Sequence, residues 1–211
     1  MTRPLSFLIA ATLCFASTVY GQSPAAKPDT NVIVPLGVGY RWEGILTTYQ
    51  SADSLNQADS AISSEIITLV SKLSDRNEDW YRLAYVKDGD SNTALFLLAN
   101  RKDGLWQRNA DYVAPDSLSR EMALVFKYPA IAGDDYQCGL ALTMNVLATD
   151  TTVTVPAGKF KCICYLATDL SGEESTDTIL FLCPGVGWVE KVGYTGSSGP
   201  NWVWVLTKLV K

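Results

Sequence analysis

Short segments rich in aromatic and β-branched residues recur along this chain, and turn residues separate them roughly every 8 to 15 positions. No helical pattern of the kind that connects parallel strands lies between them. We therefore expect a mainly β fold, an antiparallel curved sheet that forms a half-barrel or barrel-like structure, with room for one short helix. The segments predicted as strands are residues 39–49, 79–86, 93–98, 105–108, 122–128, 140–147, 151–155, 160–168, 178–183, 188–194 and 202–209.

Residues 61–73 fit two structures. Their apolar residues keep a helical spacing, and Ser60 is a suitable helix cap. The stretch 66–70 is equally a good strand, and as a strand it would form a hairpin with residues 79–86. We favour the strand. A second hairpin is predicted at Lys102-Asp103-Gly104, because an Asp-Gly pair is typical of a tight hairpin turn.

The first 21 residues have the composition of a secretory signal peptide. Arg3 supplies one positive charge, residues 5–17 are almost wholly apolar, and Val19 and Gly21 are small residues at the positions that a signal peptidase requires. The apolar run of about 13 residues is shorter than the roughly 20 that a membrane-spanning helix needs. We predict a signal peptide at 1–21, a polar linker at 22–31 and a single β domain at 32–211.

The same segment indicates where the mature chain resides. Cys14 raises the alternative of a lipid anchor, but Leu13 before it is not the small residue that a lipoprotein peptidase requires, so cleavage after Gly21 is favoured. No later apolar run is long enough to span a bilayer as a helix. We expect an exported protein of the periplasm or the extracellular space, with association with the envelope as a further alternative.

Composition argues against several classes of function. Without the predicted signal peptide the chain has 17 − 1 = 16 basic and 22 acidic residues, a net charge of −6, which disfavours nucleic acid as a partner. Histidine is absent, which removes the Ser-His-Asp and Cys-His systems and nearly all catalytic zinc sites. The glycine-rich nucleotide-binding motifs are also missing. We expect no enzyme, no metal and no cofactor.

Two carboxylate pairs keep one catalytic alternative open. Asp134-Asp135 and Glu173-Glu174 are adjacent acids of the kind that glycoside hydrolysis requires at a suitable separation. Both pairs lie in polar, turn-like segments, where acidic side chains are usually solvated. A carboxylate-based hydrolase is therefore the most distant of the functions considered.

Four cysteines remain after removal of the signal peptide: Cys138, Cys162, Cys164 and Cys183. An even number in an oxidising compartment favours two disulfides. If residues 169–176 form the loop of a hairpin, the opposed residues sum to 345, which places Thr168 opposite Asp177 and Cys162 opposite Cys183. Cys138 would then pair with Cys164. The alternatives are exchanged partners, or free buried thiols.

Aromatic and aliphatic residues supply candidates for a ligand site. Trp202 and Trp204 alternate along one strand and share a face, where they would either line a cleft or sugar platform or pack in the core. Core packing is the more frequent role of such pairs. The residues that we expect to line an apolar interior are Phe96, Leu98, Leu140, Leu142 and Trp204.

Two motifs resemble those of a known group of proteins. Residues 155–160 contain VPAGxF, and residues 184–187, about twenty positions further on, read PGVG. The combination resembles uncharacterised secreted or lipid-anchored envelope proteins of Gram-negative bacteria. That resemblance implies a curved antiparallel sheet that wraps a cavity, as in lipoprotein-carrier folds. It implies no catalytic residue.

The residues of these motifs have structural roles that can be stated in advance. Pro156 is expected to end a strand, Gly158 to allow a tight reversal, and Phe160 to return to the core. The residues expected to let the following strand kink and curl are Pro184, Gly185 and Gly187. On this basis we expect a binding or carrier module for an apolar, lipid-like ligand. The alternative is a structural or protein-interaction module of the envelope.

Overall fold

The computed structural model describes residues 30–49, 60–88, 90–109, 122–138, 141–172, 175–195 and 199–211. The predicted signal peptide and residues 22–29 of the predicted linker lie outside this part of the chain.

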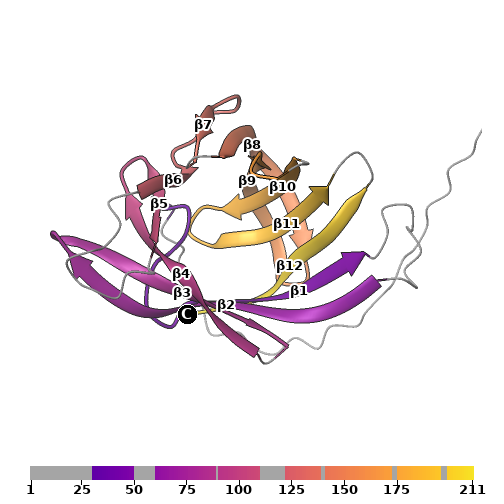
Figure 1. The fold of residues 1–211 in the computed structure, drawn as a ribbon, viewed down its shortest axis with the longest axis horizontal. Helices are drawn as coiled ribbons and strands as arrows, with labels where there is room; N and C mark the ends of the chain where they lie inside the picture. The colour runs from indigo at the N-terminus through magenta and orange to yellow at the C-terminus, as the bar shows by residue number, and fades with distance from the viewer. Residues whose placement is uncertain are drawn as a thin grey trace, which may run out of the picture.

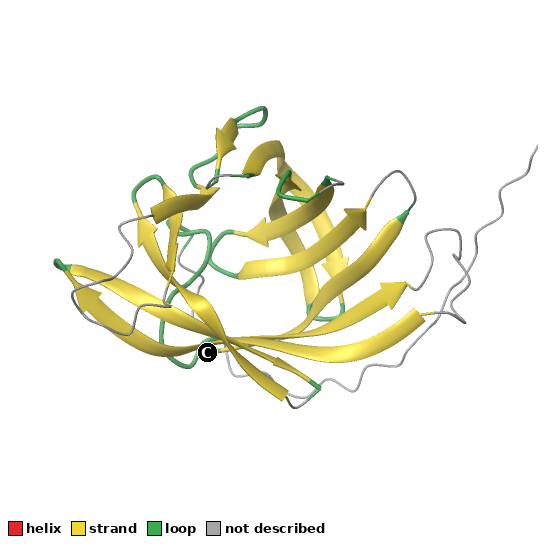
Figure 2. Ribbon diagram, in the orientation of Figure 1, coloured by secondary structure: helices red, strands yellow, loops and turns green. Residues whose placement is uncertain are grey.

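The described residues form one antiparallel sheet of twelve strands (Figures 1 and 2). This confirms the predicted fold class. The strands are β1 (Arg41–Tyr49), β2 (Ser60–Asp75), β3 (Glu78–Lys87), β4 (Asp90–Arg101), β5 (Gly104–Asn109), β6 (Met122–Lys127), β7 (Asp135–Gln137), β8 (Leu142–Val155), β9 (Gly158–Asp169), β10 (Thr176–Cys183), β11 (Gly187–Thr195) and β12 (Pro200–Val210).

The alternative of a short helix is wrong for the described residues, all of which are strands, turns or irregular segments. Residues 61–73 belong to β2, because their apolar side chains alternate across a sheet that buries Ile67 and Leu69 on one face. These residues therefore include no helix long and apolar enough to cross a membrane.

The sheet consists of two meanders that join at the chain ends. Strands β1 to β6 follow one another in space, as do β7 to β12, and β12 returns to pair with β1. Figure 1 shows the resulting curved sheet, with β6 and β7 at its two edges lying near one another. Because the sheet curls back on itself, its inner face encloses the core.

Tyrosine hydroxyls connect the edge strand β6 with β7 and β9. The Tyr136 hydroxyl of β7 accepts a hydrogen bond from the Lys127 N–H at 3.0 Å and donates one to the Val125 carbonyl at 3.2 Å. The Tyr165 hydroxyl of β9 donates to the Lys127 carbonyl at 2.8 Å. Side chains thus satisfy backbone groups of β6 that would otherwise be free edge groups.

Both predicted hairpins are present. Strands β2 and β3 pair along their length around a turn at Arg76 and Asn77, whose φ angles of 51° and 65° suit a hairpin turn. Strands β4 and β5 meet at the predicted turn before Gly104. Two details differ from the prediction: residues 140–147 and 151–155 were expected as two strands, but 142–155 form the single strand β8, and β7 was not predicted.

The two sequence motifs are the turns that flank β9 and β10. Pro156 follows the last residue of β8, Gly158 has a φ of 137° that favours glycine, and Phe160 packs against the core. In the second motif Gly185 and Gly187 have φ angles of 73° and 90°. The β10–β11 ladder has a β-bulge next to this turn, where the register shifts between residues 181 and 182 and Val189 of β11 is left without an opposed residue. Pro184 follows the last residue of β10 and is the first residue of this turn.

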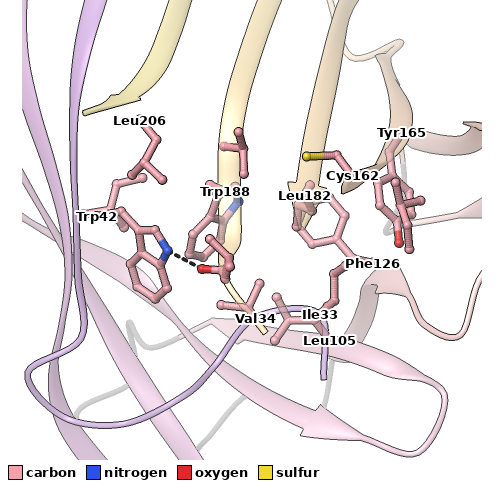
Figure 3. Packing of buried hydrophobic residues seen from close by; sticks show 14 of the residues in the cluster. Ile33, Val34, Trp42, Leu105, Phe126, Cys162, Tyr165, Leu182, Trp188 and Leu206 are labelled. Carbon is pink, nitrogen blue, oxygen red and sulfur yellow. Dashed lines mark hydrogen bonds between the residues drawn. The ribbon is translucent and has the colours of Figure 1, made fainter. Parts of the chain in front are cut away.

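An N-terminal segment packs into the space that the sheet encloses. Ile33 and Val34 have 1% and 0% of their surface exposed and pack in the main core (Figure 3). The Asn100 side chain donates to the Val34 carbonyl at 2.8 Å. Trp42 donates from its indole N–H to the Val186 carbonyl at 2.6 Å, and its ring meets Trp188 edge-on at 5.0 Å. The interior around these residues is therefore a filled core.

The cysteine register is correct, but the disulfides predicted from it are not formed. Thr168 lies opposite Asp177, as expected, and Leu182 lies opposite Ile163, one step from the two cysteines. All four cysteines are nevertheless free. Opposition in a ladder does not by itself bring two sulfur atoms together, because both side chains must also turn toward one another. The Cys183 sulfur instead lies 3.7 Å from the Pro184 carbonyl oxygen.

Candidate functional site

Two tryptophans of β12 lie flat against glycines of the neighbouring strands. Trp202 is opposite Gly193 of β11, and a Cβ atom added to that glycine would lie 2.1 Å from the indole ring. Trp204 covers Gly44 of β1, where an added Cβ would lie 2.2 Å from the ring. Such distances are far below van der Waals contact, so each ring requires a glycine beneath it. The pair was noted in the sequence, but the glycines that accommodate it were not.

An ion pair crosses the inner face of the sheet next to these rings. Lys191 is opposite Trp204 in the β11–β12 ladder, and Glu65 comes from β2, three strands from β11 in the sheet order. The Lys191 Nζ atom lies 3.8 Å from Glu65 Oε1. Only 14% of the lysine side chain and 15% of the glutamate side chain are exposed. Both charges are therefore largely removed from water.

Aromatic rings surround the lysine ammonium group. Its Nζ atom is 4.7 Å from the Trp204 ring centroid and 5.9 Å from that of Tyr85. Burial lowers the pKa of Lys191 below its ordinary value, while the negative charge of Glu65 opposes that shift. Burial, together with the charge of Glu65, raises the pKa of Tyr85 to about 12. The site thus combines one cation and one anion with an aromatic wall.

These residues line a cleft that opens to solvent and has a volume of about 250 Å³. Trp204 forms its floor, since none of its surface is exposed, whereas Trp202 is half-buried at the side. The lining is mostly apolar apart from the ion pair. The residues that line this cleft, called the Trp202 cleft below, are Leu46, Thr48, Glu65, Lys191, Trp202 and Trp204.

The residues expected to line a ligand site are only partly brought together. Trp204 lies at the Trp202 cleft, whereas Phe96 packs against the main core, edge-on to Tyr85 at 6.4 Å. Leu98 is in the filled core, and Leu142 packs against it. Leu140 lies outside the described residues.

The charged residues of the site were missed in the sequence. Glu190 and Lys191 are adjacent in a predicted strand, and neighbouring side chains of a strand point to opposite faces of the sheet. The sequence therefore indicated that one of these two charges lies on the inner face.

In the part of the chain that the structure describes, the first of the two carboxylate pairs lies at a turn. Asp134 accepts the Ile131 N–H at 2.9 Å and pairs with Lys127 at 3.0 Å, and these contacts lower the pKa of its carboxyl group. It therefore caps a turn. Asp135 is exposed, and residues 173–174 are not described. The described residues also contain no group of His, Cys, Asp and Glu side chains that could hold a metal ion.

A second aromatic cluster lies away from the main core, on β3 to β5. The Arg108 guanidinium is 4.2 Å from the Trp80 ring centroid, and that of Arg101 is 4.6 Å from the Trp106 ring centroid. Arg101 also forms two hydrogen bonds with Glu78, at 2.6 and 2.8 Å. Because the charges of Arg101 are matched within the cluster and Trp80 is buried, this surface is best explained as packing.

Comparison with known proteins gives a fold but no family. No family model and no curated protein sequence matches this chain. A solved structure from Bacteroides fragilis, of a protein with a YmcC-like fold that is taken to be exported, has a TM-score of 0.52 at 15% identity. A protein from Parabacteroides distasonis that is taken to be a lipoprotein has a TM-score of 0.48 at 13% identity. Each likeness covers 86% of this chain and all of the other.

The likeness to the Bacteroides fragilis protein shows that the curved antiparallel sheet is a shared fold. The identity is too low to carry more than the fold. Since no family model matches, the resemblance of the VPAGxF and PGVG motifs to a group of envelope proteins remains a prediction.

Proposed function

We propose that this chain is an exported, non-catalytic binding module that holds a small, largely apolar ligand in the Trp202 cleft. The observation that carries the proposal is the uneven filling of the sheet's inner face. Most of the inner face packs as one core that includes Trp204, while beside it Leu46, Thr48 and Trp202 line an open cleft. A concave, mostly apolar site with a few polar groups is typical of ligand binding.

Glycines beneath the rings support this proposal. Gly44 and Gly193 leave room for the two rings to lie against the backbone, where a Cβ atom would occupy the place of the indole. The walls are thus held in place by the sheet itself. A site on strands is more rigid than one on loops.

Export is supported by the sequence of the first 21 residues and agrees with the description of the structural neighbour with the shared fold. The non-catalytic character rests on the chemistry of the cleft. Among its described lining residues Glu65 is the sole carboxylate, and its ionisable neighbour is Lys191. Hydrolysis of a glycoside would require two carboxyl groups that face one another.

The test uses N-phenyl-1-naphthylamine, an uncharged dye that fluoresces in apolar sites. We expect saturable binding to the mature protein, which Thr48→Trp should abolish because Thr48 lies on the cleft wall and a larger side chain would fill the space. Trp106→Ala serves as the control, since Trp106 belongs to the second cluster. Dye binding that is equal in wild type and Thr48→Trp would overturn the proposal.

A further inference from the structure

The ion pair in the cleft has unused hydrogen-bonding capacity. The distance of 3.8 Å between Lys191 Nζ and Glu65 Oε1 is longer than a hydrogen bond. An ammonium group has three donors, and a carboxylate accepts through two oxygens. Both side chains line the cleft and keep a small exposed surface. A ligand that enters the cleft therefore meets a donor and an acceptor side by side.

The charge of this pair restricts which ligands can enter. A ligand carboxylate would face Lys191 favourably, but it would bring a second negative charge next to Glu65 in a poorly solvated site. A ligand ammonium would face Glu65, but Lys191 already occupies the aromatic face of Trp204 at 4.7 Å. In both cases a like charge is brought close, and removal of an ion from water is costly unless the ion gains a partner of its own.

A neutral hydroxyl group avoids both penalties. Its oxygen accepts from an ammonium and its hydrogen donates to a carboxylate, so a single group can bridge the pair. Resting on the proposed function of the cleft, we propose that Lys191 and Glu65 select ligands whose head group is uncharged and carries a hydroxyl, such as an alcohol or a sugar. The apolar part of the ligand then lies against Trp202 and Leu46.

The test compares octyl compounds that differ in their head group. In wild type, 1-octanol and octyl glucoside below its micelle concentration should displace the dye at concentrations at least about tenfold lower than octanoate or octylammonium. Glu65→Gln leaves one positive charge in the cleft, so octanoate should gain about tenfold relative to 1-octanol. Lys191→Met leaves one negative charge, so octylammonium should gain instead.

The outcomes separate this inference from the function on which it rests. If the dye binds in the cleft and octanoate or octylammonium displaces it best from wild type, the head-group inference is wrong and the binding function stands. The same holds if Glu65→Gln leaves the order of affinities unchanged. If the dye does not bind in the cleft, both fail. The wild-type series decides the question even where a variant is too unstable to purify.

Discussion

Gly44→Ala is the substitution that most directly tests how the floor of the cleft is built. The added Cβ would lie 2.2 Å from Trp204 Cε2 and 2.4 Å from Cζ2 and Nε1. Carbon atoms pack at about 3.5 Å or more, so the ring would have to retreat by at least about 1.3 Å. Trp204 has no exposed surface, and Lys191 lies over its ring. The ring therefore has little room to move.

Overpacking of this kind costs about 1–3 kcal/mol. For a domain of about 180 residues each kcal/mol corresponds to about 2–4 °C, so Gly44→Ala should lower the melting temperature by about 2–12 °C. Any retreat of Trp204 also pushes Lys191 into the cleft and should weaken dye binding. Thermal unfolding followed by circular dichroism, with a dye titration at 25 °C, measures both effects.

Gly193→Ala is the matched control. Its added Cβ would lie 2.1 Å from the Trp202 ring, but Trp202 is only partly buried and has more room to move than Trp204. This variant should lose cleft affinity with a smaller loss of stability. In a Trp204→Leu background the cost of Gly44→Ala should largely disappear, since the clash is with the indole. A Gly44→Ala protein that melts like wild type would refute the packing described for Trp204.

Three further predictions follow from the same structure. Tyr165→Phe leaves the Lys127 carbonyl without its 2.8 Å donor and should cost about 1–3 kcal/mol in urea unfolding. An unchanged midpoint would contradict a stabilising connection between β9 and the edge strand β6. Burial lowers the pKa of Lys191, so between that lowered pKa and the ordinary 10.5 the unfolded chain binds more protons than the folded one. The free energy of unfolding of wild type should therefore rise with pH in this range, relative to that of Lys191→Met. Parallel pH profiles of the two proteins would contradict this. Burial raises the pKa of Cys162 to about 12. Its alkylation by iodoacetamide at pH 8, measured by mass spectrometry, should therefore be much slower in the folded protein than in urea. Equal rates would contradict the burial of this thiol.

Much of the fold could be predicted because its signals are local. The hairpin at residues 102–104 and the turns at Gly158 and Gly185 are determined by residues whose backbone preferences are known. The same holds for the register between β9 and β10, which followed from the centre of one loop. The pairing of β1 with β12 joins residues more than 150 positions apart, and no local sequence pattern predicts it. The burial of Ile33 and Val34 depends on that closure and was likewise missed.

The site was less predictable because small irregularities decide which side chains point inward. The β-bulges between residues 43 and 44 and between 181 and 182 shift the alternation of the inner face. Without their positions, Glu190 and Lys191 are equally good candidates for the interior. The cysteines show a related difficulty, since the register was foreseen but the direction of each sulfur was not.

Native mass spectrometry of the mature protein, purified after export and without detergent, distinguishes a binding site in the Trp202 cleft from an unfilled part of the core. We expect a reproducible bound small-molecule mass in wild type that is absent from Thr48→Trp. An identical unliganded mass for both proteins, or the same adduct on both, would contradict it.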